Sequence, residues 1–351
     1  MKLAFVGLPG SGKSTVFAAI TGDEQCLQHF SADEPYRVMV LVPDERMEYL
    51  RELVQPKKFT LAHLELLDYH GLFAGGSSRD SALLAHVRDC DGIVKVLRGF
   101  TDKVGNEPDP LRDFDELATE LLLGDLGQVE RRVEKLHAAV KKPMPTVESD
   151  KAELAVLERC AEQLNQGHPI STVKMSQQEH RLLRGFQFLT SKPTMVVVNA
   201  GDGEPASDEV LAKLRERCPL VEVVNGRTEM EIAELPEGER KDFLADLGVD
   251  KPAAERLRGA FLRLLNLRCF FTTVGHELRA WAIPAGASAL DAAGKIHTDI
   301  ARGFIRAEVI HFDDLKQHGS MHDVKAANKV HTEGKEYEVL DGDILNIRFN
   351  V

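Results

Sequence analysis

A glycine-rich segment near the N-terminus has the residue types of a phosphate-binding loop. Residues 7–14 read GLPGSGKS, which fits the spacing G-x-x-x-x-G-K-[ST]. Glycines allow backbone N–H groups to converge on a β-phosphate, and the N-terminus of a following helix adds a favourable field. We expect Lys13 to bridge the β- and γ-phosphates and Ser14 to ligate Mg²⁺. The segment therefore predicts nucleotide binding rather than a turn without a ligand.

A second motif with possible chemistry is LELLDYHGL, in which Asp68 ends an apolar stretch and Gly71 lies three residues on. In an Asp-x-x-Gly switch loop, Asp68 would reach Mg²⁺ through water and the Gly71 amide would sense the γ-phosphate. Leu72 stands where Ras-type enzymes carry the glutamine that orients the attacking water, so that route to hydrolysis is excluded. His70 is the nearby side chain that could position water, and a solvated turn histidine is the alternative.

The segment MVVVNAGDGE, residues 195–204, resembles a base-reading loop. Asn199 and Asp202 keep the spacing of the Asn-Lys-x-Asp motif of GTP-binding folds, but Ala200 replaces the lysine. Guanine can donate two hydrogen bonds to the aspartate, from N1–H and from the N2 amino group. Adenine has a lone pair at N1, which would repel an ionised Asp202. The spacing alone leaves both bases open.

The elements that must position these loops follow from the apolar pattern. Apolar strands that alternate with helices indicate a parallel sheet covered on both faces. A helix is expected over residues 14–20. The expected strands cover residues 2–6, 38–42, 61–67, 92–97, 194–198 and 221–224.

A long helical segment interrupts this sheet. Over residues 111–140 apolar residues are spaced alternately four and three apart, which is a heptad seam. The segment KKPMPTVESD breaks the pattern, which then resumes, so we expect an antiparallel coiled-coil hairpin. The seam residues are Leu122, Leu126, Val129, Val133, Leu136 and Val140, then Leu154, Leu157, Ala161 and Leu164. The charged residues between them, 130–135, are expected to form a solvated outer face. A structural arm and a partner-binding arm both remain open.

The chain changes character again from about Leu267. Short β-like stretches alternate with helical ones, which predicts a small α+β module appended to the sheet domain. The expected strands cover residues 269–273, 280–283, 306–310 and 344–349.

Composition narrows the class of protein. A chain of 351 residues that is 43% hydrophobic and 28% charged is long enough for two or three folded domains. The net charge of −12 argues against nucleic-acid binding driven by the whole surface, so no DNA partner is expected. The five cysteines are scattered, which predicts reduced, mostly buried thiols. Neither a signal peptide nor a membrane span is expected, which predicts a cytoplasmic protein, and a monomer is favoured.

With these residues in hand, the chain resembles the YchF / Obg-like ATPase family of P-loop proteins. The likeness covers nearly the whole length. It includes DPLRDFDELATELLLGDLGQVERRVEKL at the start of the arm and EMEIAEL after the sixth strand. The most specific stretches are RAWAIPAGASALDAAGKIHTDIARGFIRAEVI and YEVLDGDILNIRFNV, which resemble the family's C-terminal TGS module, a ubiquitin-like β-grasp fold.

The resemblance implies an ATPase on a GTPase-like α/β fold, associated with the ribosome. It implies a nucleotide-binding domain in residues 1–110 and 188–266, a coiled-coil arm in 111–187 and a TGS domain in 267–351. It places the base-contacting loop at Asn199 and Ala200, with a glutamate in the family where this chain has Asp202. It maps the family's phosphate-binding stretch onto Gly10, Ser11, Gly12, Lys13, Ser14 and Thr15.

This chain departs from the family pattern around the γ-phosphate. Gly10 replaces an asparagine that helps hold a monovalent cation in related potassium-stimulated GTPases, so we predict that potassium stimulation is lost. The switch I threonine that completes the Mg²⁺ shell maps onto Ala32, with Ser31 or Asp33 as possible substitutes. The glycine-rich loop after Gly71 is short, AGGSSRD. These changes affect turnover more than binding.

Three functions follow from these residues. The leading one is a slow hydrolytic switch at the ribosome that prefers ATP to GTP, with Lys13, Ser14 and Asp68 acting by charge and position. The second is a nucleotide-binding scaffold with impaired hydrolysis, favoured by Ala32 and the altered phosphate loop. The third is a small-molecule or nucleotide kinase, because GLPGSGK also opens nucleotide kinases, but the TGS-like tail argues against it.

Overall fold

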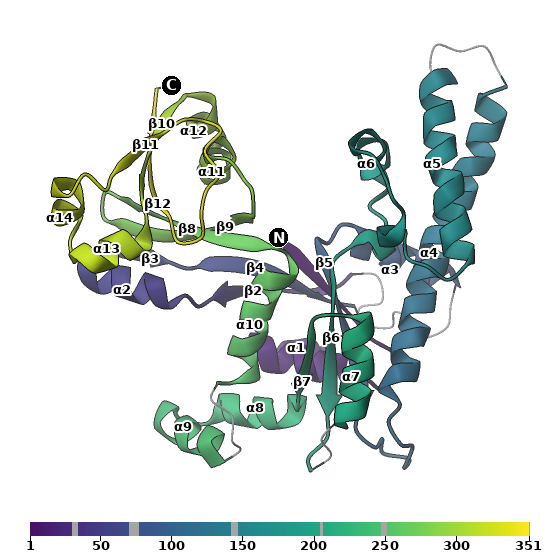
Figure 1. Ribbon diagram of the computed structural model, residues 1–351. Helices are drawn as coiled ribbons and strands as arrows, with labels where there is room; N and C mark the ends of the chain where they lie inside the picture. The colour runs from purple at the N-terminus through teal and green to yellow at the C-terminus, as the bar shows by residue number, and fades with distance from the viewer. Residues whose placement is uncertain (30–33, 70–76, 142–146, 204–205, 247–250, 351) are drawn as a thin grey trace. The chain divides into compact units, whose positions relative to one another are not determined.

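The computed structural model has two compact units, Met1–Val38 with Glu65–Ala254 and Met39–Leu64 with Glu255–Val351. It describes residues 1–29, 34–69, 77–141, 147–203, 206–246 and 251–350 (Figure 1). In that part of the chain no helix is long and apolar enough to span a bilayer. All five cysteines are buried and free of disulfides, as predicted.

The first sheet has six strands in the order β2-β4-β1-β5-β6-β7. The neighbours of β1, β5 and β6 pair in parallel, which confirms the predicted parallel sheet. The observed bounds are β1 Lys2–Val6, β2 Tyr36–Val42, β4 Ala62–Asp68, β5 Gly92–Gly99, β6 Thr194–Ala200 and β7 Val221–Val224, each within about two residues of the predicted range.

Register places the functional loops along one edge of this sheet. Phe5 on β1 lies beside Asp68 on β4, and Gly99 on β5 lies beside Ala200 on β6. Asn199 in turn lies beside Val224 on β7. Because parallel strands end at a common edge, the segments that follow β1, β4, β5, β6 and β7 meet there.

Helices connect these strands and carry apolar residues into the core. The phosphate loop leads into α1, which packs against α8. The helices of this part of the chain are α1 Lys13–Thr21, α3 Ser77–Arg88, α7 Asp208–Arg217, α8 Gly226–Glu234 and α9 Glu237–Asp246, followed by α10 Ala253–Leu264.

The interruption of the sheet is a helical arm, as the heptad seam predicted. Helices α4 (Pro110–Ala139) and α5 (Val147–Asn165) pack side by side and run in opposite directions (Figure 1). Their apolar interface contains the predicted seam residues from Leu122 to Leu164 except Val140. The predicted outer charges are largely exposed, but Arg132 differs because it forms a two-pronged ion pair with Glu153 at 2.7 and 2.8 Å.

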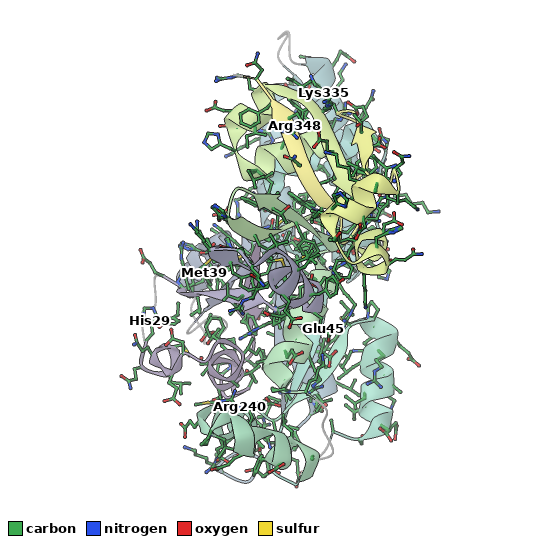
Figure 2. All side chains as sticks on the ribbon, turned by 90° about the vertical axis from the view of Figure 1, so that its left-hand side faces the viewer. His29, Met39, Glu45, Arg240, Lys335 and Arg348 are labelled. Atoms are coloured by element: carbon green, nitrogen blue, oxygen red, sulfur yellow. The ribbon has the colours of Figure 1, made fainter. Side chains whose placement is uncertain are left out.

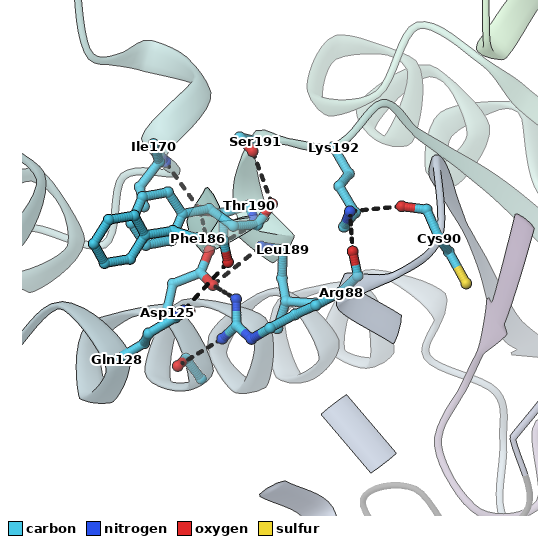
Figure 3. A network of polar contacts seen from close by, with 12 residues as sticks. Arg88, Cys90, Asp125, Gln128, Ile170, Phe186, Leu189, Thr190, Ser191 and Lys192 are labelled. Atoms are coloured by element: carbon cyan, nitrogen blue, oxygen red, sulfur yellow. Dashed lines mark hydrogen bonds and ion pairs between the residues drawn. The ribbon is translucent and has the colours of Figure 1, made fainter. Parts of the chain in front are cut away.

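A buried carboxylate on α4 connects the arm to α3 and to the segment that follows the arm, residues 189–190. Asp125 of α4 is completely buried and accepts a hydrogen bond from Arg88 of α3 at 2.6 Å. It also accepts hydrogen bonds from the Leu189 amide at 3.0 Å and from the amide and hydroxyl of Thr190, each at 2.8 Å (Figure 3). The side chain of Lys192 donates to the carbonyl oxygens of Arg88 and Cys90. These contacts hold residues 189–192, which follow the arm, against α4 and the end of α3.

The second unit contains a six-stranded mixed sheet in the order β11-β10-β12-β8-β9-β3. The first and last strands of its C-terminal part, β8 and β12, lie side by side and parallel, while β8–β9 and β10–β12 are antiparallel. This arrangement, with α11 packed on the sheet, confirms the expected β-grasp fold. The bounds are β8 Leu267–Val274, β9 Glu277–Pro284, α11 Ala289–Ile296, α12 Thr298–Arg302, β10 Phe304–Ile310, α13 Phe312–His318, α14 Met321–Ala326, β11 His331–Glu333 and β12 Ile344–Phe349.

A segment from early in the chain completes the second unit. Strand β3 (Lys58–Thr60) pairs in parallel with β9, and α2 (Glu45–Val54) packs nearby (Figure 2 labels Glu45). Arg46 of α2 bonds Asp341 at 2.8 Å and lies over the ring of Phe271 at 5.3 Å. This contact was not apparent from the sequence, since its partners are 295 residues apart.

Candidate nucleotide-binding site

The phosphate loop needs glycine for two different reasons. Gly10 and Gly12 have φ values of 82° and 73°, a region that favours glycine. Gly7 approaches strand β5 closely, because a Cβ there would lie 2.8 Å from the carbonyl oxygen of Val96 and 2.6 Å from the buried Ser11 hydroxyl. A side chain at Gly7 would push the loop away from the sheet, whereas side chains at Gly10 and Gly12 would strain the backbone, so the spacing of the motif reflects backbone shape.

Lys13 and Asp68 lie together at the centre of the site. The ammonium group of Lys13 donates to Oδ1 of Asp68, and both side chains are buried. Lys13 begins α1, directly after the loop, while Asp68 ends β4, the strand next to β1. Adjacent parallel strands therefore bring the two residues together although 55 residues separate them.

The donor set suits a magnesium ion that is shared with a nucleotide. Ser14 follows Lys13 on α1, so a hydroxyl group lies next in sequence to the lysine that contacts the carboxylate of Asp68. Hard oxygen donors are those that Mg²⁺ prefers, and Mg²⁺ takes its other ligands from phosphates and water. Within the described ranges, no group of three or more His, Cys, Asp or Glu residues is placed so that it could hold a metal ion. The residues fit a nucleotide-dependent ion rather than a preformed protein cage.

The side chain of Asn199, in the predicted base-reading loop, joins two backbone segments. Its Nδ2 donates to the carbonyl oxygen of Ser11 at 3.1 Å, and its Oδ1 accepts from the Gly226 amide at 3.1 Å. A Cβ on Gly12 would lie only 2.2 Å from the Asn199 Nδ2. A primary amide has a second N–H and a second lone pair, so Asn199 retains capacity for a base while it fixes the loop.

Asp202 lies two residues beyond β6 and is exposed. Its Oδ1 accepts hydrogen bonds from the side-chain amide of Asn225 at 2.6 Å and from the Thr228 hydroxyl at 3.0 Å. The hydrogen bond from Asn225, which has the larger effect, and the one from Thr228 hold the pKa of the Asp202 carboxyl below its ordinary value. The carboxylate is therefore ionised at neutral pH and is oriented by the segment that begins α8.

Two features of the site were not predicted from the sequence. The ring of Phe100, which follows β5, would be 3.5 Å from a Cβ on Gly12 and therefore borders the phosphate loop. Asn225 and Thr228 contact Asp202 although they lie 23 and 26 residues away from it. An aromatic residue just after a strand of the parallel sheet is a signal that could have indicated Phe100.

Several predicted residues lie outside the described part of the chain. They are His70 and Gly71 of the Asp-x-x-Gly motif, and Ser31, Ala32 and Asp33 of the switch I segment. Among the described residues, the structure brings the phosphate stretch together with Asp68 and Asn199. Ala200 is 8% exposed at the end of β6, and its methyl group is the side chain at the position of the missing lysine.

The chain resembles known proteins over its whole length. The family model YchF-GTPase_C, described as "Protein of unknown function (DUF933)", matches residues 267–350. Proteins named "Ribosome-binding ATPase YchF" from Haemophilus ducreyi and Escherichia coli O157:H7 are each 38% identical, covering 100% of this chain and 99% of the relative. The protein of the same name from Bacillus subtilis is 37% identical over 99% of this chain and 98% of its own.

A solved structure gives the same result. The structure titled "Structure of the Schizosaccharomyces pombe YchF GTPase" superposes with a TM-score of 0.87 at 30% identity, covering 99% of this chain and 97% of that one. Identity of this level over full length, together with a shared fold, is sufficient to assign a family. The resemblance drawn from the motifs is confirmed, and the chain belongs to the YchF family.

Proposed function

We propose that this protein binds ATP with Mg²⁺ and hydrolyses it slowly, as a switch that works at the ribosome. The observation that carries the proposal is the meeting of Lys13, Asp68 and Asn199 at one edge of the parallel sheet. A phosphate-binding loop, a metal-binding carboxylate and a base-reading loop are the parts that a P-loop hydrolase needs. The relatives named "Ribosome-binding ATPase YchF" support ATP, the ribosome and a cytoplasmic location.

The phosphate groups would be held by charge and backbone dipoles. The glycine backbone and the N-terminus of α1 would surround the β-phosphate, and Lys13 would bridge to the γ-phosphate. Ser14 and, through water, Asp68 would hold the magnesium ion. Its positive charge would offset the negative charge of the phosphate oxygens. Lys13 would exchange its contact with Asp68 for one shared with the phosphates. Catalysis by position and charge requires no covalent intermediate.

The base loop supports ATP over GTP by a modest margin. Ala200 removes the lysine whose stem would pack under guanine. Asn199 would contact the base together with backbone groups, while Asp202 is held toward Asn225 and Thr228. The half-buried ring of Phe100 supplies an apolar surface beside Gly12 on which a base could pack.

Three residues that the motifs and the family pattern assign to the surroundings of the γ-phosphate favour slow over rapid turnover. Leu72 and Ala32 cannot orient water or ligate a metal, and Gly10 replaces the asparagine associated with a potassium site. The same departures favour the second candidate, a nucleotide-binding scaffold that barely hydrolyses. His70 remains the proposed water-positioning residue, and Gly71 the proposed sensor of the γ-phosphate.

We also propose that the chain works in three parts. The nucleotide-binding part covers residues 1–110 and 188–266, the coiled-coil arm covers 111–187, and the TGS part covers 267–351. Support for the last boundary is the family-model match at residues 267–350. The tight junction at Asp125 supports an arm that is anchored on the nucleotide-binding part.

Steady-state phosphate release tests the function. With ATP and Mg²⁺ we expect slow release that increases when ribosomes are added, and equal rates in potassium and sodium chloride. Tight ATP binding without release under either condition would support the scaffold instead. Transfer of phosphate to a nucleoside monophosphate would support the kinase. Rates several-fold higher in potassium would contradict the proposed effect of Gly10.

A further inference from the structure

The carboxylate of Asp202 is already partly occupied by the protein. Two side chains, the Asn225 amide at 2.6 Å and the Thr228 hydroxyl at 3.0 Å, donate to the same oxygen, Oδ1. A carboxylate oxygen has two lone-pair positions. Two donors therefore use the accepting capacity of Oδ1, while Oδ2 can still accept from a ligand.

The two donors are held firmly. Asn225 is the N-cap of α8, and its Oδ1 accepts a hydrogen bond from the backbone N–H of Thr228 at 3.1 Å. One side chain therefore binds both Asp202 and the helix. The next residue, Gly226, donates its amide to Asn199. A Cβ on Gly226 would lie 3.2 Å from Val16 of α1, so this turn is close-packed. One four-residue segment, 225–228, thus orients both residues that could read a base.

The consequence concerns the choice of base. Guanine offers Asp202 two donors, N1–H and N2–H, which match the two oxygens of a free carboxylate. With Oδ1 occupied, Asp202 cannot pair one oxygen with N1–H and the other with N2–H unless it loses a protein partner.

We propose that Asn225 and Thr228 are specificity-determining residues that keep half of the Asp202 carboxylate from guanine. They thereby weaken GTP recognition and leave ATP as the preferred nucleotide. This inference rests on the proposed nucleotide-binding function and adds the residues that set its base preference.

The inference can be tested with two conservative variants. Thr228→Val keeps the shape and the backbone amide of the residue but removes the hydroxyl donor. In Asn225→Ser/Thr228→Val, serine retains an N-cap oxygen and the amide donor is lost. The probes are ADP, GDP and IDP, measured by isothermal titration calorimetry with Mg²⁺. IDP lacks the 2-amino group and so reports the second hydrogen bond to guanine.

In the unmodified protein we expect GDP and IDP to bind within about twofold of each other. In the double variant, GDP should gain roughly tenfold over IDP, the size expected for one hydrogen bond to a charged group, while ADP affinity is unchanged. Thr228→Val should show part of this gain. Adding Asp202→Ala to the double variant should abolish it. Thr119→Val, which removes an exposed hydroxyl of α4 that donates to the carbonyl oxygen of Asp115, is the matched control and should leave all three affinities unchanged.

Two results would overturn the inference alone. One is GDP binding at least tenfold tighter than IDP in the unmodified protein. The other is weaker GDP binding in Thr228→Val, which would mean that the hydroxyl presents Asp202 to guanine. If ADP, GDP and IDP all fail to bind the unmodified protein, the proposed function itself is wrong, and the inference falls with it. Thermal unfolding of each variant checks that it is folded.

Discussion

Asp68 and Asp125 are both completely buried, but the protein supplies them with very different partners. Asp125 receives an arginine and three donors from residues 189 and 190, all belonging to the junction of the arm. Asp68 contacts Lys13, the residue that the phosphate-loop motif assigns to the nucleotide. The first carboxylate is committed to neighbours that stay in place. The second is paired with a cation that a polyphosphate would also attract.

Asp125 has the partners of a structural charge, whereas Asp68 has the partner expected of the functional charge that we propose. A buried carboxylate stabilises the fold when charged and polar donors satisfy its oxygens. Near a ligand site, the same charge can instead balance a lysine and hold a metal ion. Burial by itself does not distinguish the two cases, whereas the identity of the partner does.

The largest expected effect is on stability, from Asp125→Ala. Removing one partner of a buried ion pair leaves Arg88 and two amides without their acceptor, which costs about 3–5 kcal/mol. Thermal and denaturant unfolding should show this loss, while the folded fraction binds ATP normally. Glu153→Ala is the control, because its pair with Arg132 is more exposed and should contribute about 1 kcal/mol or less. Equal losses in the two variants would contradict the proposed difference.

The next effect is on hydrolysis, from Lys13→Met. We expect the rate of ATP hydrolysis to fall by at least about 100-fold, because a preorganised positive charge near the developing phosphate charge is lost. The single variant also leaves Asp68 buried without its lysine, which lowers stability. In Lys13→Met/Asp68→Asn both charges are absent, so stability should recover while hydrolysis stays lost. Normal ATP turnover in either variant would contradict the proposed role of Lys13 in hydrolysis.

A third buried charge, Lys95 on β5, extends the comparison to a group with an aromatic neighbour. Its ammonium lies 4.5 Å from the centre of the Phe114 ring, and no hydrogen bond or ion pair of this group is found within the described residues. Burial lowers the pKa of Lys95 from 10.5 to about 8. The folded state therefore binds this proton less tightly than the unfolded state, and stability rises with pH between about 8 and 10.5.

Lys95→Met should accordingly stabilise the protein at pH 7, by at most roughly 3 kcal/mol. The gain should shrink as the pH rises from about 8 toward 10.5 and disappear above that range, where Lys95 is neutral in both the folded and the unfolded state. Denaturant unfolding at pH 7 and pH 10 measures it. A gain of the same size at both pH values would show that packing, rather than charge, is responsible.

Much of the fold was predictable because its signals are local. The apolar strands, the heptad seam of the arm and the β-like stretches after Leu267 each appear in a short window of sequence. The phosphate loop is also local, since glycine and lysine at fixed spacing are dictated by the backbone path around a phosphate. The contacts of Asp125 were not predictable, because its donors come from residues 88, 189 and 190 and no periodicity links them.

The sequence by itself indicated the phosphate-binding loop, the element types and the family, because motif spacing and apolar periodicity are read directly from the order of residues. Only the tertiary structure decided which charges meet. Parallel register placed Asp68 beside the phosphate lysine, and the α8 cap turned Asn225 and Thr228 onto Asp202. The tertiary structure also placed residues 58–60 at the edge of the C-terminal sheet, beside β9. The reason is physical: hydrogen bonds between distant segments depend on through-space geometry, which residue spacing does not encode.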